Sequence, residues 1–307
     1  MELMKGNEIT QAIKEKLSQI EERENIRILY ACESGSRAWG FASPDSDYDV
    51  RFIFVRPVQD YLRVKELPDF IDAELNEVYD INGWDLKKFC KHLYKSNPVL
   101  FEWADSPIVY KTSDDWEKIR AVMKDYICQK SMIHHYLGLA KCTMKKYLTG
   151  ETITYKKYFY ILRAVLAASW VFYKNSWAPT EYSKLAVAEI TSEDEKDFEE
   201  MQVGSRSRSE KNSRGEFLGE SPSSCAAMAD LYEKKSSNSE KTDGKRNKGL
   251  ECFINNRITI INASIDKCRI QDVEKQIFSW EKLDELFLNI AGRETVAEGE
   301  KTCEASF

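Results

Sequence analysis

Two aspartates separated by one residue are the first feature of this sequence that could do chemistry. Asp47 and Asp49 alternate with Tyr48 and Val50, and in a β-strand this period of two places both carboxylates on one face. Like charges so close repel each other, and carboxylate oxygens are the ligands that Mg²⁺ prefers. The pair therefore predicts a metal site for Mg²⁺, with Mn²⁺ as an alternative. Two ions roughly 3.5–4 Å apart would activate an attacking oxygen and stabilise a leaving pyrophosphate.

A Gly-Ser pair stands ten residues before the aspartates. Gly35 and Ser36 follow the apolar segment I-R-I-L-Y-A-C-E at residues 26–33, which is typical of a buried strand that enters a loop. Glycine at such a turn lets backbone N–H groups approach phosphate oxygens, and Ser36 adds a hydroxyl donor. The pair is therefore a candidate contact for a triphosphate.

Three further side chains near the motif have two interpretations each. Arg37 either binds the triphosphate or forms an ion pair with Glu33 or Asp45, since arginine suits phosphate and carboxylate equally. Ser46 either contacts phosphate or makes a hydrogen bond within the turn. Arg51 either reaches phosphate or balances the charge of Asp49.

The elements that must position these residues can be read from the pattern. A helix is expected at residues 8–22, a strand at 26–33 and a second strand at 47–55, closed by Pro57. Residues 74–84 alternate well enough for a third strand, after which Asp85 can cap a helix that begins at Leu86. Each signal is weak alone, and an Asp-x-Asp strand is more often a solvated edge. The fixed order of the parts makes the combination stronger.

This combination resembles the signature of the DNA polymerase beta-like nucleotidyltransferase superfamily. The longer string E-S-G-S-R-A-W-G-F-A-S-P-D-S-D-Y-D-V-R-F-I-F-V, with D-I-N-G-W-D-L-K-K-F, is similar to a bacterial and phage family of predicted nucleotidyltransferases, one branch of which is linked to RNA repair. The resemblance covers residues 26–177. It implies an α+β fold, in which a palm with a mixed β-sheet is followed by an α-helical domain.

By matching position, the resemblance makes Asp47 and Asp49 metal ligands, and it makes Gly35 and Ser36 triphosphate contacts. Such enzymes use a third carboxylate on a neighbouring strand, and Asp80 matches that position. Asp80 would act as the third metal ligand or as the base for an acceptor hydroxyl. Asp85 competes for this role, but its place before a helix favours an N-cap.

Composition divides the remaining chain into helical and polar parts. Helical spacing dominates residues 116–150 and 158–173, where Lys156, Lys157, Tyr160 and Arg163 form a basic-aromatic cluster. Residues 191–250 are rich in Ser, Lys and Glu and are expected to lack fixed order, as a genuine insertion or as a disturbance of the reading frame. We therefore expect five segments: a palm domain at 1–112, a helical substrate domain at 113–190, the polar segment at 191–250, C-terminal helices at 251–292 and a tail at 293–307.

The overall composition restricts the class of protein. The net charge of -6 argues against general coating of nucleic acid, although it allows a local basic groove. Neither a signal peptide nor a membrane span is visible, so the cytoplasm is the expected compartment and no membrane partner is expected. The eight cysteines are scattered without a C-x-x-C pair, which favours reduced, structural thiols.

The function that this sequence favours is Mg²⁺-dependent transfer of a nucleoside monophosphate from NTP to a hydroxyl, with release of pyrophosphate. The acceptor stays open among an RNA end, a protein hydroxyl and a small molecule. The alternative is a non-catalytic module that binds nucleotide as a regulator or antitoxin.

Overall fold

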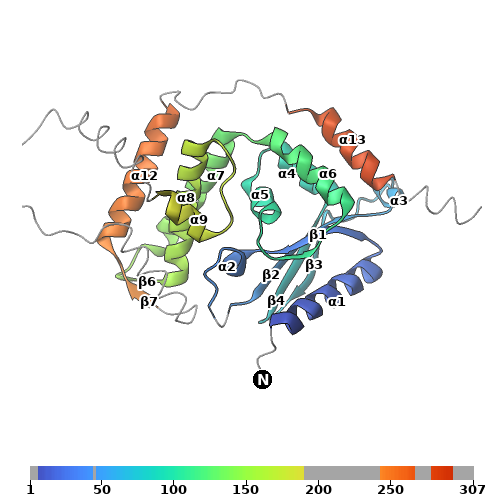
Figure 1. The fold of residues 1–307 in the computed structure, drawn as a ribbon, viewed down its shortest axis with the longest axis horizontal. Coiled ribbons are helices and arrows are strands. Elements are labelled where there is room, and N and C mark those ends of the chain that lie inside the picture. Colours follow the sequence, from blue (N-terminus) through green and yellow to red (C-terminus); the bar gives the residue numbers. More distant parts are fainter. Residues whose placement is uncertain (1–5, 44–45, 190–242, 267–277, 293–307) are drawn as a thin grey trace, which may run out of the picture. The chain divides into compact units, whose positions relative to one another are not determined.

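The computed structural model describes residues 6–43, 46–189, 243–266 and 278–292, which form two compact units (Figure 1). The first unit contains the described parts of Met1–Trp39, Ser46–Met132 and Asp272–Phe307. The second contains those of Gly40–Asp45 and Ile133–Gln271. Most of the polar segment expected at 191–250, the tail at 293–307 and Asp45 lie outside the described residues.

The first unit is built on a five-stranded mixed sheet. Its strands stand in the order β3-β4-β2-β1-β5, with β2 and β4 parallel and every other neighbouring pair antiparallel. The expected α+β fold with a mixed sheet is thereby confirmed. The strand bounds are β1 (Arg27–Glu33), β2 (Tyr48–Val55), β3 (Phe70–Leu75), β4 (Tyr79–Asp85) and β5 (Val109–Lys111).

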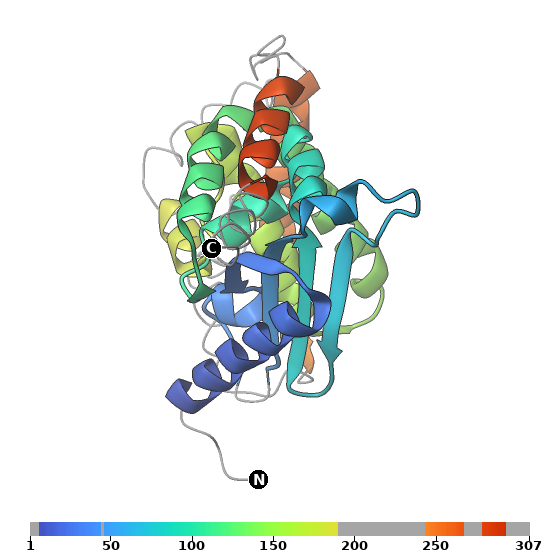
Figure 2. The same ribbon diagram turned by 90° about the vertical axis from the view of Figure 1, so that its right-hand side faces the viewer.

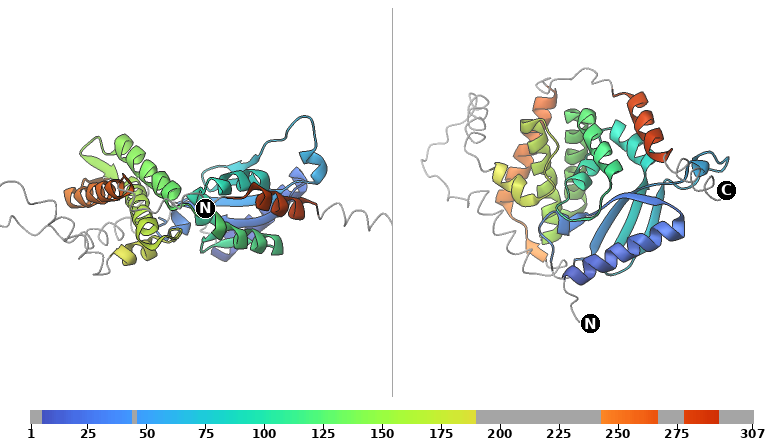
Figure 3. Two further views of the ribbon diagram at one scale, coloured as in Figure 1. Left: turned by 90° about the horizontal axis from the view of Figure 1, so that it is seen from above. Right: turned by 45° about the vertical axis from the view of Figure 1, so that its right-hand side comes forward.

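Helix α1 (Gly6–Glu24) covers one face of this sheet (Figures 2 and 3). Its buried residues Ile13, Leu17 and Ile20 recur at helical spacing, and they share one apolar cluster with Val50, Phe52 and Phe54 of β2 and with Ile81 of β4. Alternation along β2 then turns Asp49 and Arg51 to the opposite face of the sheet. Because the apolar residues of β2 must face α1, the polar residues between them must lie on the opposite face of the sheet.

The strand expected at 74–84 is present as β4, but its bounds were wrong, because residues 74–78 contain the end of another strand and a turn. β3 ends at Leu75 and β4 begins at Tyr79, so β3 was missed by the sequence pattern. The Asn76 side chain accepts hydrogen bonds from the backbone N–H groups of Val78 and Tyr79, both at 2.8 Å. An asparagine that binds its own following backbone favours a turn over a continuous strand.

Several helices of this unit begin at a residue whose side chain caps their first turn. Asp85 accepts a hydrogen bond from the Lys87 backbone N–H at 2.7 Å, which confirms its expected N-cap role. Similar caps begin α5, α6 and α13 at Asn97, Ser113 and Ser279. The helices of this unit beyond α1 are α2 (Gly35–Ala38), α3 (Val58–Tyr61), α4 (Leu86–Tyr94), α5 (Pro98–Ala104), α6 (Asp114–Met123), the 3-10 helix η1 (Lys124–Tyr126) and α13 (Trp280–Ala291).

The second unit is mainly helical. Helix α8 has Phe159, Leu162 and Val165 fully buried, and it packs against α9 and α12 (Figure 1). The last residues of the expected polar segment, 243–250, have regular structure. They contain β7, which pairs with β6, and the first turn of α12. Its elements are most of α7 (Gln129–Tyr147), β6 (Thr152–Thr154), α8 (Tyr155–Lys174), α9 (Tyr182–Glu189), β7 (Asp243–Lys245) and α12 (Lys248–Asp266).

The sequence predicts reduced cysteines and no helix that spans a membrane. The cysteines in the described parts of the chain, such as Cys32 and Cys90, are free thiols. In the same parts, no helix combines the length and apolarity that crossing a bilayer requires.

Candidate active site

The parallel pairing of β2 and β4 brings two candidate carboxylates together. Asp49 and Asp80 are direct register partners, as are Arg51 and Asn82 two residues further along. All four side chains alternate with residues of the α1 core, so they lie on the face opposite α1. Asp85, at the other end of β4, is instead the register partner of Phe54. The topology therefore favours Asp80 over Asp85 as the third carboxylate.

Arg51 links these two carboxylates through a single nitrogen. Its Nη2 donates to Asp49 Oδ1 at 3.0 Å and to Asp80 Oδ2 at 2.7 Å, while Nη1 donates to the Asp80 carbonyl oxygen at 2.8 Å. Asn82 Nδ2 donates to the other oxygen of Asp80 at 3.3 Å. Of the two interpretations of Arg51, the structure favours charge balance, because the guanidinium is engaged by the carboxylates.

Gly35 lies directly against the Asp49 carboxylate. Its φ is +60°, and a Cβ added to it would lie 1.9 Å from Asp49 Oδ2. The adjacent Ser34 backbone N–H donates to the Asp49 carbonyl oxygen at 2.8 Å, which holds the turn and β2 together. Glycine is therefore required at this position for two reasons, the left-handed backbone and the close approach of a carboxylate.

Arg37 holds the backbone of the loop that leads into β2. Its Nε donates to the Asp47 carbonyl oxygen at 3.0 Å and its Nη2 to that of Ser46 at 2.6 Å, and the guanidinium lies 3.8 Å from the Tyr48 ring centroid. The buried hydroxyls of Ser36 and Ser46 are 3.2 Å apart. The structure therefore brings Gly35, Ser36, Arg37 and Ser46 around the start of the Asp47 to Asp49 segment.

Glu33 is a residue of this site that the sequence pattern did not single out. It is fully buried, its Oε1 accepts the Asp49 backbone N–H at 2.9 Å, and its Oε2 accepts the Tyr110 hydroxyl at 2.5 Å. Burial, with a smaller contribution from the Asp49 charge, raises the pKa of the Glu33 carboxyl to about 7. The available signal was a lone acid at the end of an otherwise apolar strand.

This buried acid makes stability depend on pH. Between its ordinary pKa of 4.5 and its folded pKa of about 7, the folded chain binds the proton more tightly than the unfolded chain. The free energy of unfolding should therefore fall as pH rises through this window, by roughly 3 kcal/mol. Glu33→Gln can still accept the Asp49 N–H through its amide oxygen, while its amide N–H would donate to the Tyr110 hydroxyl oxygen in a reversed hydrogen bond. This variant cannot titrate and should remove the fall, as urea unfolding at several pH values would show. The exposed Glu77→Gln should leave it unchanged, and equal pH slopes in wild type and Glu33→Gln would contradict the assignment.

The donor set fits a hard divalent cation in its chemistry. Of the three predicted ligands, the structure brings Asp49 and Asp80 together, and both supply carboxylate oxygens. The missing Cβ of Gly35 leaves room for Asp49 Oδ2 beside the turn. Within the described ranges, no group of three or more His, Cys, Asp or Glu side chains is gathered closely enough to hold a metal ion. Arg51 instead supplies the positive charge between two of these carboxylates.

The basic-aromatic cluster expected on α8 is divided between surface and interior. Lys157 lies over the rings of Tyr147 and Tyr160, at 4.6 and 5.1 Å from their centroids. Arg163 is buried, and its Nη2 donates to the Thr180 carbonyl oxygen at 3.4 Å. Lys157 is thus half-buried against these two rings, whereas Arg163 belongs to the core of the second unit.

A mixed sheet with carboxylates on neighbouring parallel strands, beside a Gly-Ser turn, defines the palm of a polymerase beta-like nucleotidyltransferase. Residues 9–212 match the family described as the RNA repair pathway DNA polymerase beta family, and the chain belongs to this family. The uncharacterized protein YcgL of Bacillus subtilis (strain 168) is 39% identical over 176 residues, which are 57% of this chain and 68% of that relative. The resemblance inferred from the motif is thereby confirmed.

Proposed function

We propose that the protein is a Mg²⁺-dependent nucleotidyltransferase that transfers a nucleoside monophosphate from NTP to a hydroxyl and releases pyrophosphate. The observation that carries this proposal is the pairing of Asp49 with Asp80 across parallel strands, with Gly35 pressed against the Asp49 carboxylate. Carboxylates held this close cost electrostatic energy, and a fold tolerates that cost most readily where the charges are used.

Each side chain of the site has a distinct task in this proposal. One or two Mg²⁺ ions held by Asp47, Asp49 and Asp80 would supply positive charge to the triphosphate and to the attacking oxygen. Arg51 orients the carboxylates of Asp49 and Asp80. Glu33 fixes the backbone at Asp49 by accepting its N–H. Gly35 and Ser36 bind the triphosphate. Catalysis then depends mainly on positioning and on charge neutralisation.

The acceptor loses a proton and its oxygen attacks the α-phosphorus of NTP. A new P–O bond forms, the bond to pyrophosphate breaks, and in this proposal the proton of the acceptor passes to a carboxylate oxygen of Asp80 that does not bind metal. The description of the family points to an RNA end as the first acceptor to test. A protein hydroxyl and a small molecule are the other two candidates.

The direct test is transfer of label from each α-labelled NTP, with Mg²⁺ or Mn²⁺, to a mixture of RNA and protein acceptors. We expect transfer by the wild type and its loss in Asp47→Ala, with Asp284→Ala, an exposed carboxylate of α13, as the matched control. If nucleotide binds but wild type and Asp47→Ala transfer the same background of label, the protein is a nucleotide-binding regulator and the catalytic proposal fails.

A further inference from the structure

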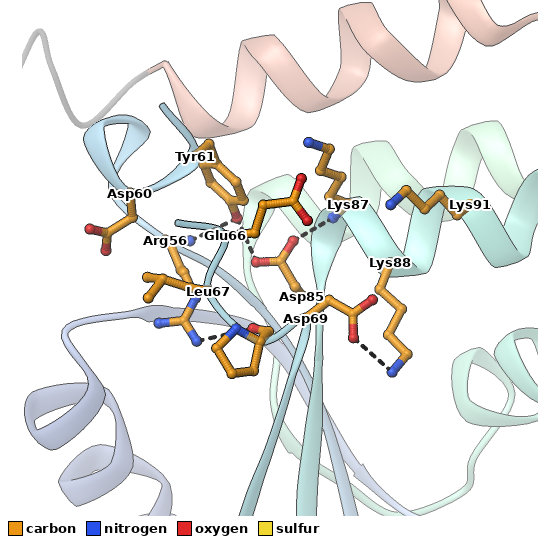
Figure 4. Close-up of a pocket in the computed structure, with 11 residues that line it drawn as sticks. Arg56, Asp60, Tyr61, Glu66, Leu67, Asp69, Asp85, Lys87, Lys88 and Lys91 are labelled. Carbon is orange, nitrogen blue, oxygen red and sulfur yellow. Dashed lines mark hydrogen bonds and ion pairs between the residues drawn. The ribbon is translucent and has the colours of Figure 1, made fainter. Parts of the chain in front are cut away.

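A pocket lies in the first unit at the ends of β2 and β4 that are far from Asp49 and Asp80 (Figure 4). Asp49 and Arg56 are seven residues apart along an extended segment, so the pocket is about 23 Å from the candidate active site, at ~3.3 Å per residue. Its cavity of about 140 Å³ is lined by the loop before β3 and by the first turns of α4. This volume is small for a whole nucleotide, since sites for drug-sized ligands begin at roughly 300 Å³.

Arg56 is a buried cation in this pocket whose N–H groups are mostly unused. The residue is 7% exposed, its Nε has no hydrogen-bond partner, and its Nη2 is 3.4 Å from the Pro68 carbonyl oxygen. In the described part of the chain, no carboxylate lies within ion-pair distance of it. A buried guanidinium normally has a carboxylate or phosphate partner, because an unpaired buried charge is costly.

Asp85 is an acid of this pocket that lies close enough to Arg56 to be influenced by its charge, but it does not accept hydrogen bonds from the guanidinium. Its oxygens accept the Lys87 backbone N–H at 2.7 Å and the Tyr61 hydroxyl at 2.8 Å. Burial raises the pKa of Asp85 above its ordinary value, although the Arg56 charge and these hydrogen bonds act in the opposite direction. Asp85 therefore leaves the guanidinium donors unsatisfied.

Two exposed lysines add positive charge on the α4 side of the pocket. Lys87 and Lys91 are four residues apart, so they lie on one side of the helix, as Figure 4 shows. Neither has an ion-pair partner among the described residues, whereas Lys88 pairs with Asp69 at 3.1 Å. Of the acids that line the pocket, Asp60 and Asp69 form ion pairs and Asp85 caps α4. Among the described residues, Glu66 has neither kind of partner. The helix begins here, and its dipole also favours an anion.

We propose that this pocket binds a phosphate monoester dianion between Arg56 and the lysines Lys87 and Lys91. Among the described lining residues, three cations lack a carboxylate partner, whereas Glu66 and Asp85 are the acids that lack a cationic one. The remaining positive charge and the unused guanidinium N–H groups match an anionic ligand. The planar guanidinium donates several N–H groups to phosphate oxygens, and the lysines contribute mobile charges at the rim. The group comes from free phosphate or from the phosphorylated end of an RNA, which present the same chemistry to these residues.

The test is titration with inorganic phosphate in EDTA, followed by ³¹P line broadening. The wild type should bind saturably, and Lys87→Ala with Lys91→Ala should weaken the affinity at least about tenfold, since two charge-assisted contacts are lost. The matched control is Lys14→Ala with Lys124→Ala, which removes the same charge from exposed positions elsewhere in this unit. Arg56→Lys keeps the charge but loses the planar donors, and it should also weaken binding.

Several outcomes decide the proposal. No saturable binding by the wild type, or equal losses in the pocket variant and in the control, would overturn it. Displacement of phosphate by a 5′-phosphorylated oligoribonucleotide but not by its 5′-hydroxyl form supports the site and identifies an RNA end as the source. Displacement by neither supports it with free phosphate as the ligand. Asp47→Ala should retain phosphate binding, so this site can fail or succeed independently of the proposed transfer activity.

Discussion

Asp49→Asn is expected to reduce nucleotide transfer by roughly a thousandfold, equivalent to about 4 kcal/mol of transition-state stabilisation. The amide keeps the shape of the carboxylate and can still accept the hydrogen bond from Arg51 Nη2, which is 3.0 Å away. It removes the negative charge that a divalent cation requires. The rate measured under saturating NTP and Mg²⁺ with a labelled acceptor tests this expectation.

The same substitution should leave the fold at least as stable as before. The negative charge of Asp49 contributes to the raised pKa of the buried Glu33, so its removal relieves a repulsion. Arg51 keeps its 2.7 Å ion pair with Asp80. We expect a free energy of unfolding that is unchanged or higher by up to about 1 kcal/mol, which is typical where a charge serves activity at the expense of stability.

Asp284→Asn is the matched control for this experiment, because it makes the same change on an exposed carboxylate of α13. It should alter neither rate nor stability appreciably. Transfer by Asp49→Asn at a rate close to that of the wild type would remove Asp49 from the catalytic site. Loss of activity together with unfolding would show a structural role instead.

Local pattern was enough to find most elements of the palm, but not to pair them. The helix before β1 and the strands β1 and β2 follow from apolar spacing, because each spacing is set by neighbours in the chain. β3 was missed since its six residues, F-I-D-A-E-L, have one buried side chain, Ile71. The parallel pairing of β2 with β4 depends on a crossover through β3, and no local signal specifies it.

The candidate site shows the same division between local and non-local information. The spacing of Asp47 and Asp49 is visible in the sequence, and Arg51 is visible beside them on the same face. The second partner of Arg51, Asp80, becomes apparent from the register of β2 and β4. Glu33 had only a weak signal, as the acid that ends an apolar strand, and Arg56 had none, because what distinguishes both residues is burial in three dimensions.

Gly35→Ala is expected to reduce transfer by at least about a hundredfold, a loss typical of a misplacement of about 1 Å in a reacting group. A Cβ at this position would lie 1.9 Å from Asp49 Oδ2, so the carboxylate and the turn must move apart. The left-handed backbone at φ +60° adds about 1–2 kcal/mol of strain for alanine. The activity should therefore fall by more than backbone strain alone would cause.

Gly40→Ala separates these two effects within the same motif. Gly40 also has a positive φ, +82°, but a Cβ there would meet nothing within 4 Å. We expect it to lower the free energy of unfolding by about 1–2 kcal/mol and to leave the rate within a fewfold of the wild type, because strain acts without displacing a carboxylate. Rates and urea unfolding of both variants decide the matter. If the two alanines reduce transfer equally, backbone conformation of the loop controls the rate, and the contact between Gly35 and the Asp49 carboxylate has no special role.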